Sequence, residues 1–341
     1  MNHKKTVCLL LSMGLLLMTM VSFPFAASAK IIEGGPYDKP GPDAIYQFNT
    51  DTGQLSIIGT GNLNHKYILF SSFKDDITSI VVSEGITNIS DWLFYGLTNV
   101  KSVKLPDTVR EIGDVAFSGC TSLQSITLGS ELRSIGFGAF ENCVSLTSIT
   151  LPEKVYWIDT AAFYKSGLTS ITIPSSVTTY GTGIFEECPN LQTAVIHSNA
   201  DIPGQMFKRC PSLKTVTLSE RIKSIGNEAF WVCESLTDIN IPSYVTNIGT
   251  RAFSSCDLRQ LKLPYSLRTL GVAAFGSNEN LESIEFGAGI TAIPDSCFSS
   301  CSALKKIVLP VGVTSIGENA FSYCQSLENL ALPPTVTTIG A

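Results

Sequence analysis

Apolar and polar side chains follow a pattern that repeats along most of the chain. Each repeat contains a short alternating segment, a second pair of apolar residues and an Ala-Phe step. The phenylalanine of that step recurs at intervals of 22 or 23 residues, at Phe94, Phe117, Phe140, Phe163, Phe185, Phe207, Phe230, Phe253, Phe275, Phe298 and Phe321. A fixed period of this length is typical of small units stacked along one axis. The pattern therefore predicts a repeat protein over the larger part of the 341 residues.

Each unit follows approximately the consensus LxxIxLPxxVxxIGxxAFxxC, as residues 146–163 and 236–256 illustrate. The alternating IxL step predicts a short strand with one buried face. The proline after it ends the strand, because proline has no N–H to donate to the ladder. The VxxI pair predicts a second short strand on the far side of the coil, and the glycine that follows suits a tight bend.

The AFxxC step is too short to form a stable helix by itself. We expect it to form one helical or 3₁₀ turn in which the alanine and phenylalanine point inward. No unit of this size buries its apolar face alone, whereas stacked units pack leucine on leucine and phenylalanine on phenylalanine. The sequence therefore predicts a right-handed solenoid with a continuous parallel β-sheet on its concave face. Short second strands and helical or 3₁₀ turns are expected on the other faces.

These motifs resemble the BspA-like leucine-rich repeats, a 23-residue class found in bacterial surface proteins. The resemblance covers about residues 77–341, and ten successive phenylalanine spacings agree with the class within one residue. It implies a leucine-rich-repeat solenoid of about eleven to twelve units. It also implies a secreted or surface-displayed protein that binds macromolecules of a host or neighbouring cell. The last unit stops mid-repeat at residues 339–341, so we expect a fragment, or a chain that continues into further repeats or an anchor.

Residues 1–29 have the organisation of a signal peptide. Lys4 and Lys5 precede an apolar run at residues 7–21, and the small residues 27–29 form a cleavage-site pattern. A transmembrane helix is the alternative interpretation of the same run. Secretion is therefore the expectation for the rest of the chain.

Residues 30–76 precede the array and lack its motif. Tyr46 and Phe48 alternate with polar residues before a turn, and Leu55 and Ile57 alternate after it. This pattern predicts a β-hairpin. We expect the hairpin to cover the open apolar end of the first coil, with a small separate functional domain as the alternative.

Charged residues form only 15% of the chain, and the formal net charge is -6. Proteins that bind a phosphate backbone carry a basic face, and the sequence offers none. Nucleic acid is therefore not an expected partner. No second apolar run is long enough to span a membrane.

Ten cysteines in a secreted protein would ordinarily indicate disulfides. Eight of them, however, share the position three residues after the repeat phenylalanine, namely Cys120, Cys143, Cys188, Cys210, Cys233, Cys256, Cys301 and Cys324. Ser166 and Asn278 hold this position in two other units, and Leu97 holds it in the first. Stacked side chains in one column have parallel Cβ directions, which do not suit a disulfide without movement of the backbone. We therefore expect free, buried thiols.

Candidate catalytic groups are few. Beyond the signal peptide only His65 and His197 could serve as a histidine base, and His197 is expected at a solvent-facing strand end. Asp238 and Glu285 face the same side, but they should lie roughly 10 Å or more apart, with no pocket around them. No paired cysteine motif with histidine support suggests a metal, and no phosphate-binding or dinucleotide motif occurs. We expect no enzyme activity and no cofactor or metal.

The outward-facing positions of the first strands form two columns on the predicted concave sheet. Serine and threonine dominate the N-terminal two-thirds, and charged and amide side chains occupy the rest. We expect the ligand-binding surface to comprise Ser148, Thr150, Ser170, Thr172, Thr193, Thr215, Asp238, Asn240, Gln260, Lys262 and Glu285. The alternative is that these side chains bind no ligand and only keep the exposed face of the sheet soluble. Neither column contains an aromatic residue, which disfavours a platform for sugar rings.

The sequence thus favours a secreted or cell-surface, monomeric, non-enzymatic binding or adhesion module. It is expected to recognise an extracellular protein or glycan through its concave face. Two alternatives stay open. One is the repeat region of a larger surface enzyme whose catalytic domain lies beyond Ala341. The other is a structural scaffold with no ligand of its own.

Overall fold

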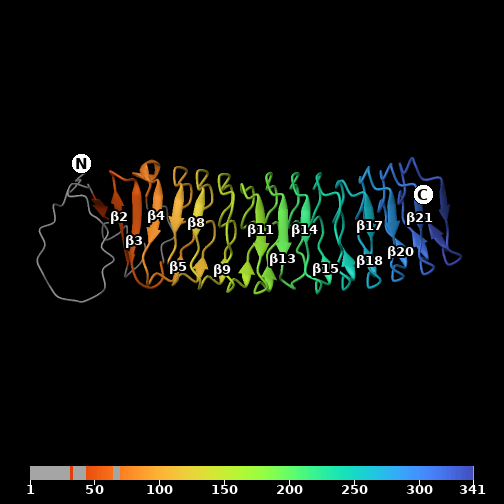
Figure 1. Ribbon diagram of the computed structural model, residues 1–341, viewed down its shortest axis with the longest axis horizontal. Helices are drawn as coiled ribbons and strands as arrows, with labels where there is room; N and C mark the ends of the chain where they lie inside the picture. Colours follow the sequence, from red (N-terminus) through yellow and green to blue (C-terminus); the bar gives the residue numbers. More distant parts are fainter. Residues whose placement is uncertain (1–30, 34–43, 64–69, 341) are drawn as a thin grey trace, which may run out of the picture.

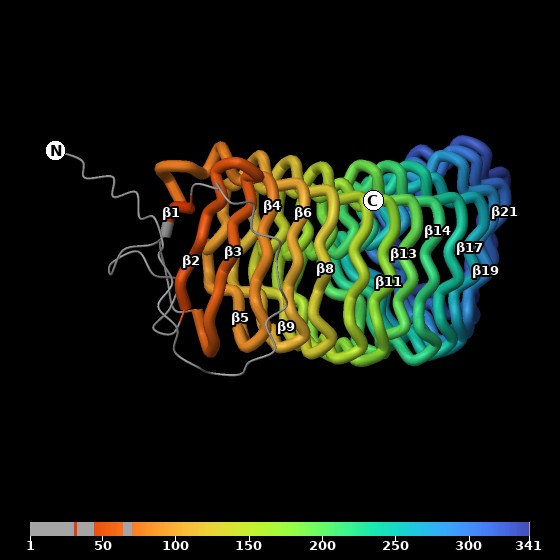
Figure 2. The backbone as a smooth tube through the Cα atoms, turned by 60° about the vertical axis from the view of Figure 1, so that its left-hand side comes forward, coloured from red at the N-terminus to blue at the C-terminus, as the bar shows by residue number. Residues whose placement is uncertain are grey.

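The computed structural model describes residues 31–33, 44–63 and 70–340. The chain winds in successive coils along one long axis (Figure 1), and consecutive coils lie side by side along its length (Figure 2). The predicted signal peptide at residues 1–29 lies outside the described residues, as does His65. Among the residues that are described, no helix has the length and apolar character needed to cross a membrane.

One side of the coils carries the strands that the IxL step predicts. We call it the strand face; its strands are β4 (Ser79–Val82), β6 (Ser102–Lys104), β8 (Ser125–Thr127), β11 (Ser170–Ile173), β13 (Thr193–Ile196), β14 (Thr215–Thr217), β17 (Gln260–Lys262), β19 (Ser283–Glu285), β21 (Lys306–Val308) and β23 (Asn329–Ala331). Neighbouring strands of the same sheet pair in parallel, one coil apart, so that Ser102 lies beside Ser125 and Ser283 beside Lys306. The predicted parallel pairing is confirmed.

A second side of the coils carries two-residue strands from the VxxI step; they are β5 (Asn88–Ile89), β7 (Glu111–Ile112), β9 (Ser134–Ile135), β10 (Trp157–Ile158), β12 (Thr179–Tyr180), β15 (Ser224–Ile225), β16 (Asn247–Ile248), β18 (Thr269–Leu270), β20 (Ala292–Ile293), β22 (Ser315–Ile316) and β24 (Thr338–Ile339). These strands also pair in parallel, for example Ile112 beside Ile135. The predicted second strands are therefore present.

The segment before the array contains the predicted hairpin. β2 (Ala44–Asn49) and β3 (Gln54–Gly59) pair antiparallel, and β1 (Ile31–Glu33) pairs antiparallel with β2. β3 then pairs in parallel with β4, so the hairpin extends the first sheet of the array. The Phe48 ring stacks on Phe73 at a centroid separation of 4.6 Å, and both rings are buried. The function of this segment as a cap stays a prediction.

The repeat phenylalanines form one column through the core. From Phe94 to Phe321 each ring stacks on the next, with centroid separations of 5.0 to 5.7 Å. Ten of these rings are fully buried, and only Phe321, in the last coil, is partly exposed. Stacked aromatic pairs stabilise by about 0.5–1.5 kcal/mol beyond the area they bury. The column therefore joins every coil of the array to its neighbours.

The AFxxC steps do not form the helical or 3₁₀ turns that the sequence predicts. They form successive tight turns, and the structure assigns 3₁₀ geometry within its described residues only to η1 (Lys74–Asp76). The residues two before and two after the phenylalanine have positive φ, as at Gln205 (61°) and Arg209 (55°). Such left-handed residues turn alternate N–H groups away from their own chain and interrupt a helix.

These N–H groups instead bond to the next coil. The N–H groups of Val115, Phe117 and Gly119 donate to the carbonyl groups of Phe137, Ala139 and Glu141 at 2.7, 2.8 and 2.8 Å. The same three bonds recur along the array, and they form a third hydrogen-bonded ladder on what we call the turn face. A free helical turn could not supply this ladder, because its N–H groups would bond within the same turn.

The strand face is not the continuous sheet that the sequence predicts. It divides after β8 and again after β14, where residues 148–150 and 238–240 stand in place of strands. In each case the following coil is one residue shorter, with 22 residues from Ile149 to Ile171 and from Ile239 to Leu261. A third short coil, from Ala194 to Val216, accompanies a break in the second sheet between β12 and β15. The break between β18 and β20 falls in a 23-residue coil, and coil length does not explain it.

The Phe230→Ala substitution should lower the free energy of unfolding by about 3–5 kcal/mol, because it removes a fully buried ring with neighbours on both sides. Denaturant unfolding followed by circular dichroism measures the change. Tyr244→Ala is the control, since this side chain is 61% exposed and should change stability by less than about 0.5 kcal/mol. A loss below about 1 kcal/mol at Phe230 would show that the core register is wrong.

Candidate functional site

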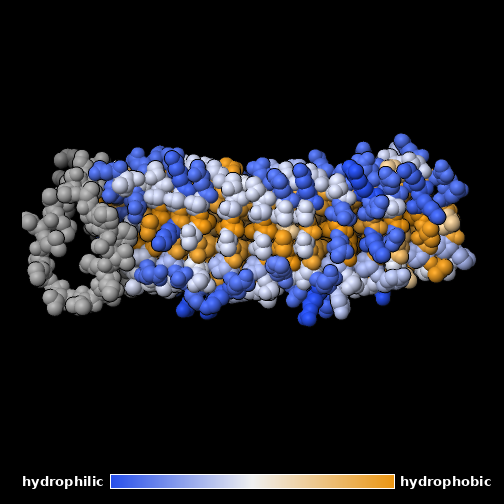
Figure 3. All heavy atoms as spheres, viewed as in Figure 1, coloured by the Kyte–Doolittle hydropathy of each residue, from blue (hydrophilic) through white to orange (hydrophobic). Residues whose placement is uncertain are grey.

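The predicted contact residues do share one surface. All of them are exposed except Thr193, which is half-buried. The residues between them point inward, as Ile171 and Leu261 do. Figure 3 shows one face of the molecule, with hydrophobic surface along the middle and hydrophilic side chains along both edges. The alternation of the strands thus places the predicted polar columns in solvent, over a largely aliphatic base.

The charged members of this set are partly engaged with one another. The Lys262 ammonium lies 3.4 Å from the Glu285 carboxylate, across the pair of strands β17 and β19. Both side chains are more than 70% exposed, so the pair contributes little to stability. Exposed charges of this kind are available to discriminate between partners.

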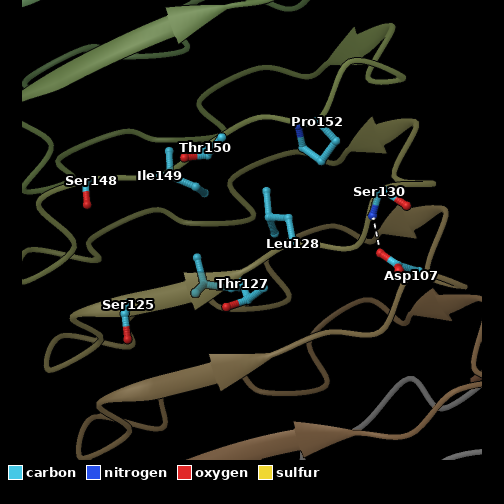
Figure 4. Close-up of a pocket in the computed structure, with 10 residues that line it drawn as sticks. Asp107, Ser125, Thr127, Leu128, Ser130, Ser148, Ile149, Thr150 and Pro152 are labelled. Carbon is cyan, nitrogen blue, oxygen red and sulfur yellow. Dashed lines mark hydrogen bonds between the residues drawn. The ribbon is translucent and has the colours of Figure 1, made fainter.

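The first interruption of the strand face opens a cleft between β8 and residues 147–150. Within the described chain, no backbone hydrogen bond joins β8 to residues 147–150, and none joins residues 148–150 to β11. The cleft has a volume of about 430 Å³. Figure 4 shows the residues that line it, with those of one coil facing those of the next; they are Asp107, Ser125, Ile126, Thr127, Leu128, Ser130, Ser148, Ile149, Thr150 and Pro152.

The base of the cleft is aliphatic and its rim is hydroxyl-bearing. Ile126, Leu128 and Ile149 are only partly buried and pack against the core, whereas the equivalent side chains of β6 and β11 are buried. The exposed hydroxyl groups of Ser125, Thr127, Ser148 and Thr150 border it. The interruption therefore exposes two core side chains, Ile126 and Ile149, whose equivalents are buried in the fully paired coils.

The two walls of the cleft are tied to different coils. On one side, glycine replaces the usual proline at position 129, and a Cβ there would lie 1.9 Å from the carbonyl oxygen of Pro106. Next to it, the N–H of Ser130 donates to the Asp107 carboxylate at 2.8 Å (Figure 4), so this wall lies close against the preceding coil. On the other side, Thr169 N–H donates to the carbonyl of Thr147 at 3.0 Å and ties the second wall to the following coil.

The sequence analysis named Ser148 and Thr150 but not the cleft that they border. Two signals in the sequence could have indicated it. The coil from Ile149 to Ile171 is one residue short, and Leu128-Gly129 stands where most units have Leu-Pro or Ile-Pro. At the second interruption the equivalent Ile239 stays buried, so a short coil by itself does not expose the core.

The predicted catalytic candidates are not assembled into a site. The side chain of His197 is exposed at the end of β13, as expected. Its backbone N–H donates to the carbonyl of Ile173 at 3.0 Å. Glu285 is paired with Lys262 rather than with Asp238. Among the described residues, no group of three or more histidine, cysteine, aspartate or glutamate side chains is arranged to hold a metal ion.

The cysteine column has a defined chemical role in the core. The nine described cysteines are free thiols, and only Cys324 is less than fully buried. Each thiol in the repeated position donates to the phenylalanine carbonyl of the preceding coil, as Cys210 does to Phe185 at 3.0 Å and Cys233 to Phe207 at 3.1 Å. Asn278 makes the same contact with Phe253 through its amide at 2.8 Å. The position is a buried donor site that cysteine and asparagine both satisfy.

A second polar cluster lies on the turn face, and the sequence analysis did not identify it. The Lys208 ammonium lies 3.3 Å from Glu186 and 3.1 Å from Glu228, and it sits 5.2 Å from the centre of the Trp231 ring. Burial opposes ionisation of Glu228, but hydrogen bonds from Gln205 and Lys208 outweigh it and hold the pKa of Glu228 below its usual value. These charges satisfy one another, so the cluster serves first to join successive coils.

A model of the BspA type leucine-rich repeat region matches residues 66–192, 116–237 and 223–341. The chain belongs to this leucine-rich repeat family. Among solved structures, this leucine-rich repeat protein is similar to one from Bacteroides ovatus, with a TM-score of 0.64 and 25% identity over 88% of this chain and 90% of that one. A leucine-rich repeat protein from Eubacterium ventriosum gives a TM-score of 0.56 and 24% identity, over 89% and 92% of the two chains. No curated protein matches the chain.

The thiols of this leucine-rich repeat protein should be unreactive in the native state. Burial raises the pKa of Cys120 to about 12 and that of Cys188 to about 11, so neither forms the reactive thiolate near neutral pH. The raised pKa contributes stability that is complete below the unfolded-state pKa of about 8.5 and is lost as the pH rises toward the folded values. Alkylation at pH 8, counted by mass spectrometry, should label all cysteines in denaturant without reductant and few in buffer. Fewer than half labelled in denaturant would indicate disulfides.

Backbone amides at the two interruptions should exchange with solvent faster than those of paired strands. Residues 148–150 and 238–240 lack ladder bonds, whereas Ala194 lies in β13 between two paired strands. Hydrogen exchange should differ by at least about two orders of magnitude between these groups, because unpaired segments open at little free-energy cost. Equal protection at residues 148–150 and 194 would mean that the cleft is closed in solution.

Proposed function

We propose that this protein is a secreted or surface-displayed, monomeric module that binds an extracellular macromolecule, most directly a protein, through its strand face. The observation that carries the proposal is that ten of the eleven predicted contact residues are exposed on one face, over a base of buried, stacked side chains. Extended surfaces of this kind are how solenoids present contacts to large partners. The proposed location rests on the expected leader at residues 1–29 and on the surface proteins that the motifs resemble.

The composition of the strand face favours many modest contacts over a few strong ones. Its columns contain short hydroxyl side chains, which lose little rotamer entropy on binding. They lack the tryptophan, tyrosine and arginine side chains that usually dominate a tight interface. We therefore expect weak binding per molecule, and strength from the display of many copies.

The C-terminal part of the strand face should provide most of the discrimination between partners. Asp238, Lys262 and Glu285 are exposed charges there, and the N-terminal part offers mainly neutral hydroxyl groups. Charged groups reject mismatched partners more strongly than hydroxyl groups do, because burying an unpaired charge is costly.

Binding to a panel of matrix proteins and glycans, measured by surface plasmon resonance, should fall when Asp238, Lys262 and Glu285 are all changed to serine. The loss should be about tenfold, as for removal of a few partly exposed contacts. The matched control changes Lys74, Asp75 and Asp76 to serine in η1, which removes the same charges from exposed positions outside the two polar columns. If the control abolishes binding and the strand-face variant binds normally, the proposed surface is wrong.

A further inference from the structure

The walls of the cleft between β8 and residues 147–150 carry unused backbone groups. In a parallel strand, alternate residues bond to opposite neighbours. Ser125 and Thr127 bond toward β6: Ser125 N–H donates to Lys101, and Thr127 C=O accepts from Leu105. The N–H and C=O of Ile126 therefore face the cleft, and neither has a backbone partner in the described structure. Backbone polar groups at a partly buried edge require partners from solvent or from a ligand.

The unused backbone groups of Ile126 stand next to the aliphatic base of the cleft. Ile126, Leu128 and Ile149 line this base, and the labelled serine and threonine side chains lie along its rim (Figure 4). The volume of about 430 Å³ is within the range of sites that hold small ligands or a few residues of a peptide. An unpaired strand edge beside an aliphatic pocket is the arrangement by which sheets bind extended peptides, where backbone bonds give affinity and the pocket gives selectivity.

We propose that this cleft binds an extended peptide segment of the partner, whose backbone bonds to the free edge of β8 and whose aliphatic side chain packs against Ile126, Leu128 and Ile149. This inference rests on the proposed function and specifies the partner as a protein with an exposed, extended segment. A sugar is disfavoured, because no aromatic ring lines the cleft. A lipid chain is disfavoured, because hydroxyl groups and the Asp107 carboxylate surround the short apolar base.

The same coils explain why the edge stays available. The wall formed by β8 is held to the preceding coil by its ladder with β6 and by the contact of Ser130 with Asp107. The opposite side of these coils stays paired, since β10 bonds to both β9 and β12. The coils thus separate on the strand face alone, and the cleft exists without loss of the array.

The test uses the whole protein and a set of fluorescently labelled, end-blocked heptapeptides of serine and threonine. The central residue is leucine, isoleucine, valine or methionine, with an aspartate peptide as the matched control. Fluorescence anisotropy should show saturable binding of at least one aliphatic peptide, at least about tenfold tighter than the aspartate peptide. N-methylation of the two amides flanking its central residue should weaken binding by a similar factor, because it removes backbone donors. No binding by any aliphatic peptide, or equal binding of the aspartate peptide, would overturn the proposal.

Two variants of the protein locate the site. Thr127→Trp places a large ring at the rim and should abolish peptide binding, whereas Val308→Trp, at the equivalent exposed position of fully paired β21, should leave it unchanged. Insertion of one glycine between Ser166 and Gly167 lengthens the coil from Ile149 to Ile171 to 23 residues. It should weaken peptide binding, because residues 148–150 can then pair with β8 and close the cleft. Peptide binding that survives Thr127→Trp would overturn the proposed site.

The outcomes separate this inference from the proposed function. If a macromolecular partner loses binding to the Asp238, Lys262 and Glu285 variant but binds Thr127→Trp normally, the strand face is correct and the cleft is not its peptide site. If neither change affects the partner, while the η1 control abolishes its binding, both proposals fail. If the partner and the aliphatic peptides both lose binding to Thr127→Trp and compete with one another, both proposals hold.

Discussion

Each coil of this protein is held in place by the coils on either side, so the length of a coil is the constraint on which the rest of the structure depends. Three hydrogen-bonded ladders join neighbouring coils, on the strand face, the second-strand side and the turn face. All three keep register only if each coil contributes the same number of residues. When a coil has 22 residues rather than 23, one ladder loses its alignment. A repeat array has no other element to absorb the difference.

The backbone hydrogen bonds and ring stacking of the turn face are kept in the short coils as well, whereas the sheets are interrupted there. In the short coil after Phe163, the N–H of this phenylalanine still donates to Ile184 at 2.9 Å, and its ring still stacks on Phe185 at 5.3 Å. The column combines ring stacking with backbone bonds and with the buried donor three residues later, which bonds to a phenylalanine carbonyl. Losing this alignment would expose large rings and leave buried carbonyls unpaired, which costs more than opening a two- or three-residue strand pair. The pairing of strands on the strand face therefore differs from coil to coil, and the candidate binding surface and cleft lie on this face.

The buried donor position accounts for cysteine and asparagine three residues after the repeat phenylalanine, because both offer a hydrogen-bond donor although they differ in volume and polarity. In the first coil the buried Leu97 fills this position by packing alone. Asn278 donates to Phe253 and Phe275 at 2.8 Å, and Cys301 donates to Phe275 at 3.4 Å. The free thiols thus serve the packing of the coils, which accounts for their number in a chain whose described cysteines form no disulfide.

The sequence by itself determined the period, the parallel solenoid, the hairpin at residues 44–59 and the inward and outward positions of the strands, because each follows from spacing and alternation that recur many times. It did not predict the backbone of the AFxxC step, where left-handed residues such as Gln205 and Arg209 direct N–H groups to the next coil. Those conformations are stabilised only by the neighbouring coil, so no local propensity reveals them. Only the tertiary structure decided where the strand face opens, since the cleft beside Ile126 and Ile149 forms where β8 and residues 147–150 are tied to different coils and share no backbone bond. Ile126 and Ile149 lie 23 residues apart in the sequence, and only the stacking of their coils brings them to the same cleft.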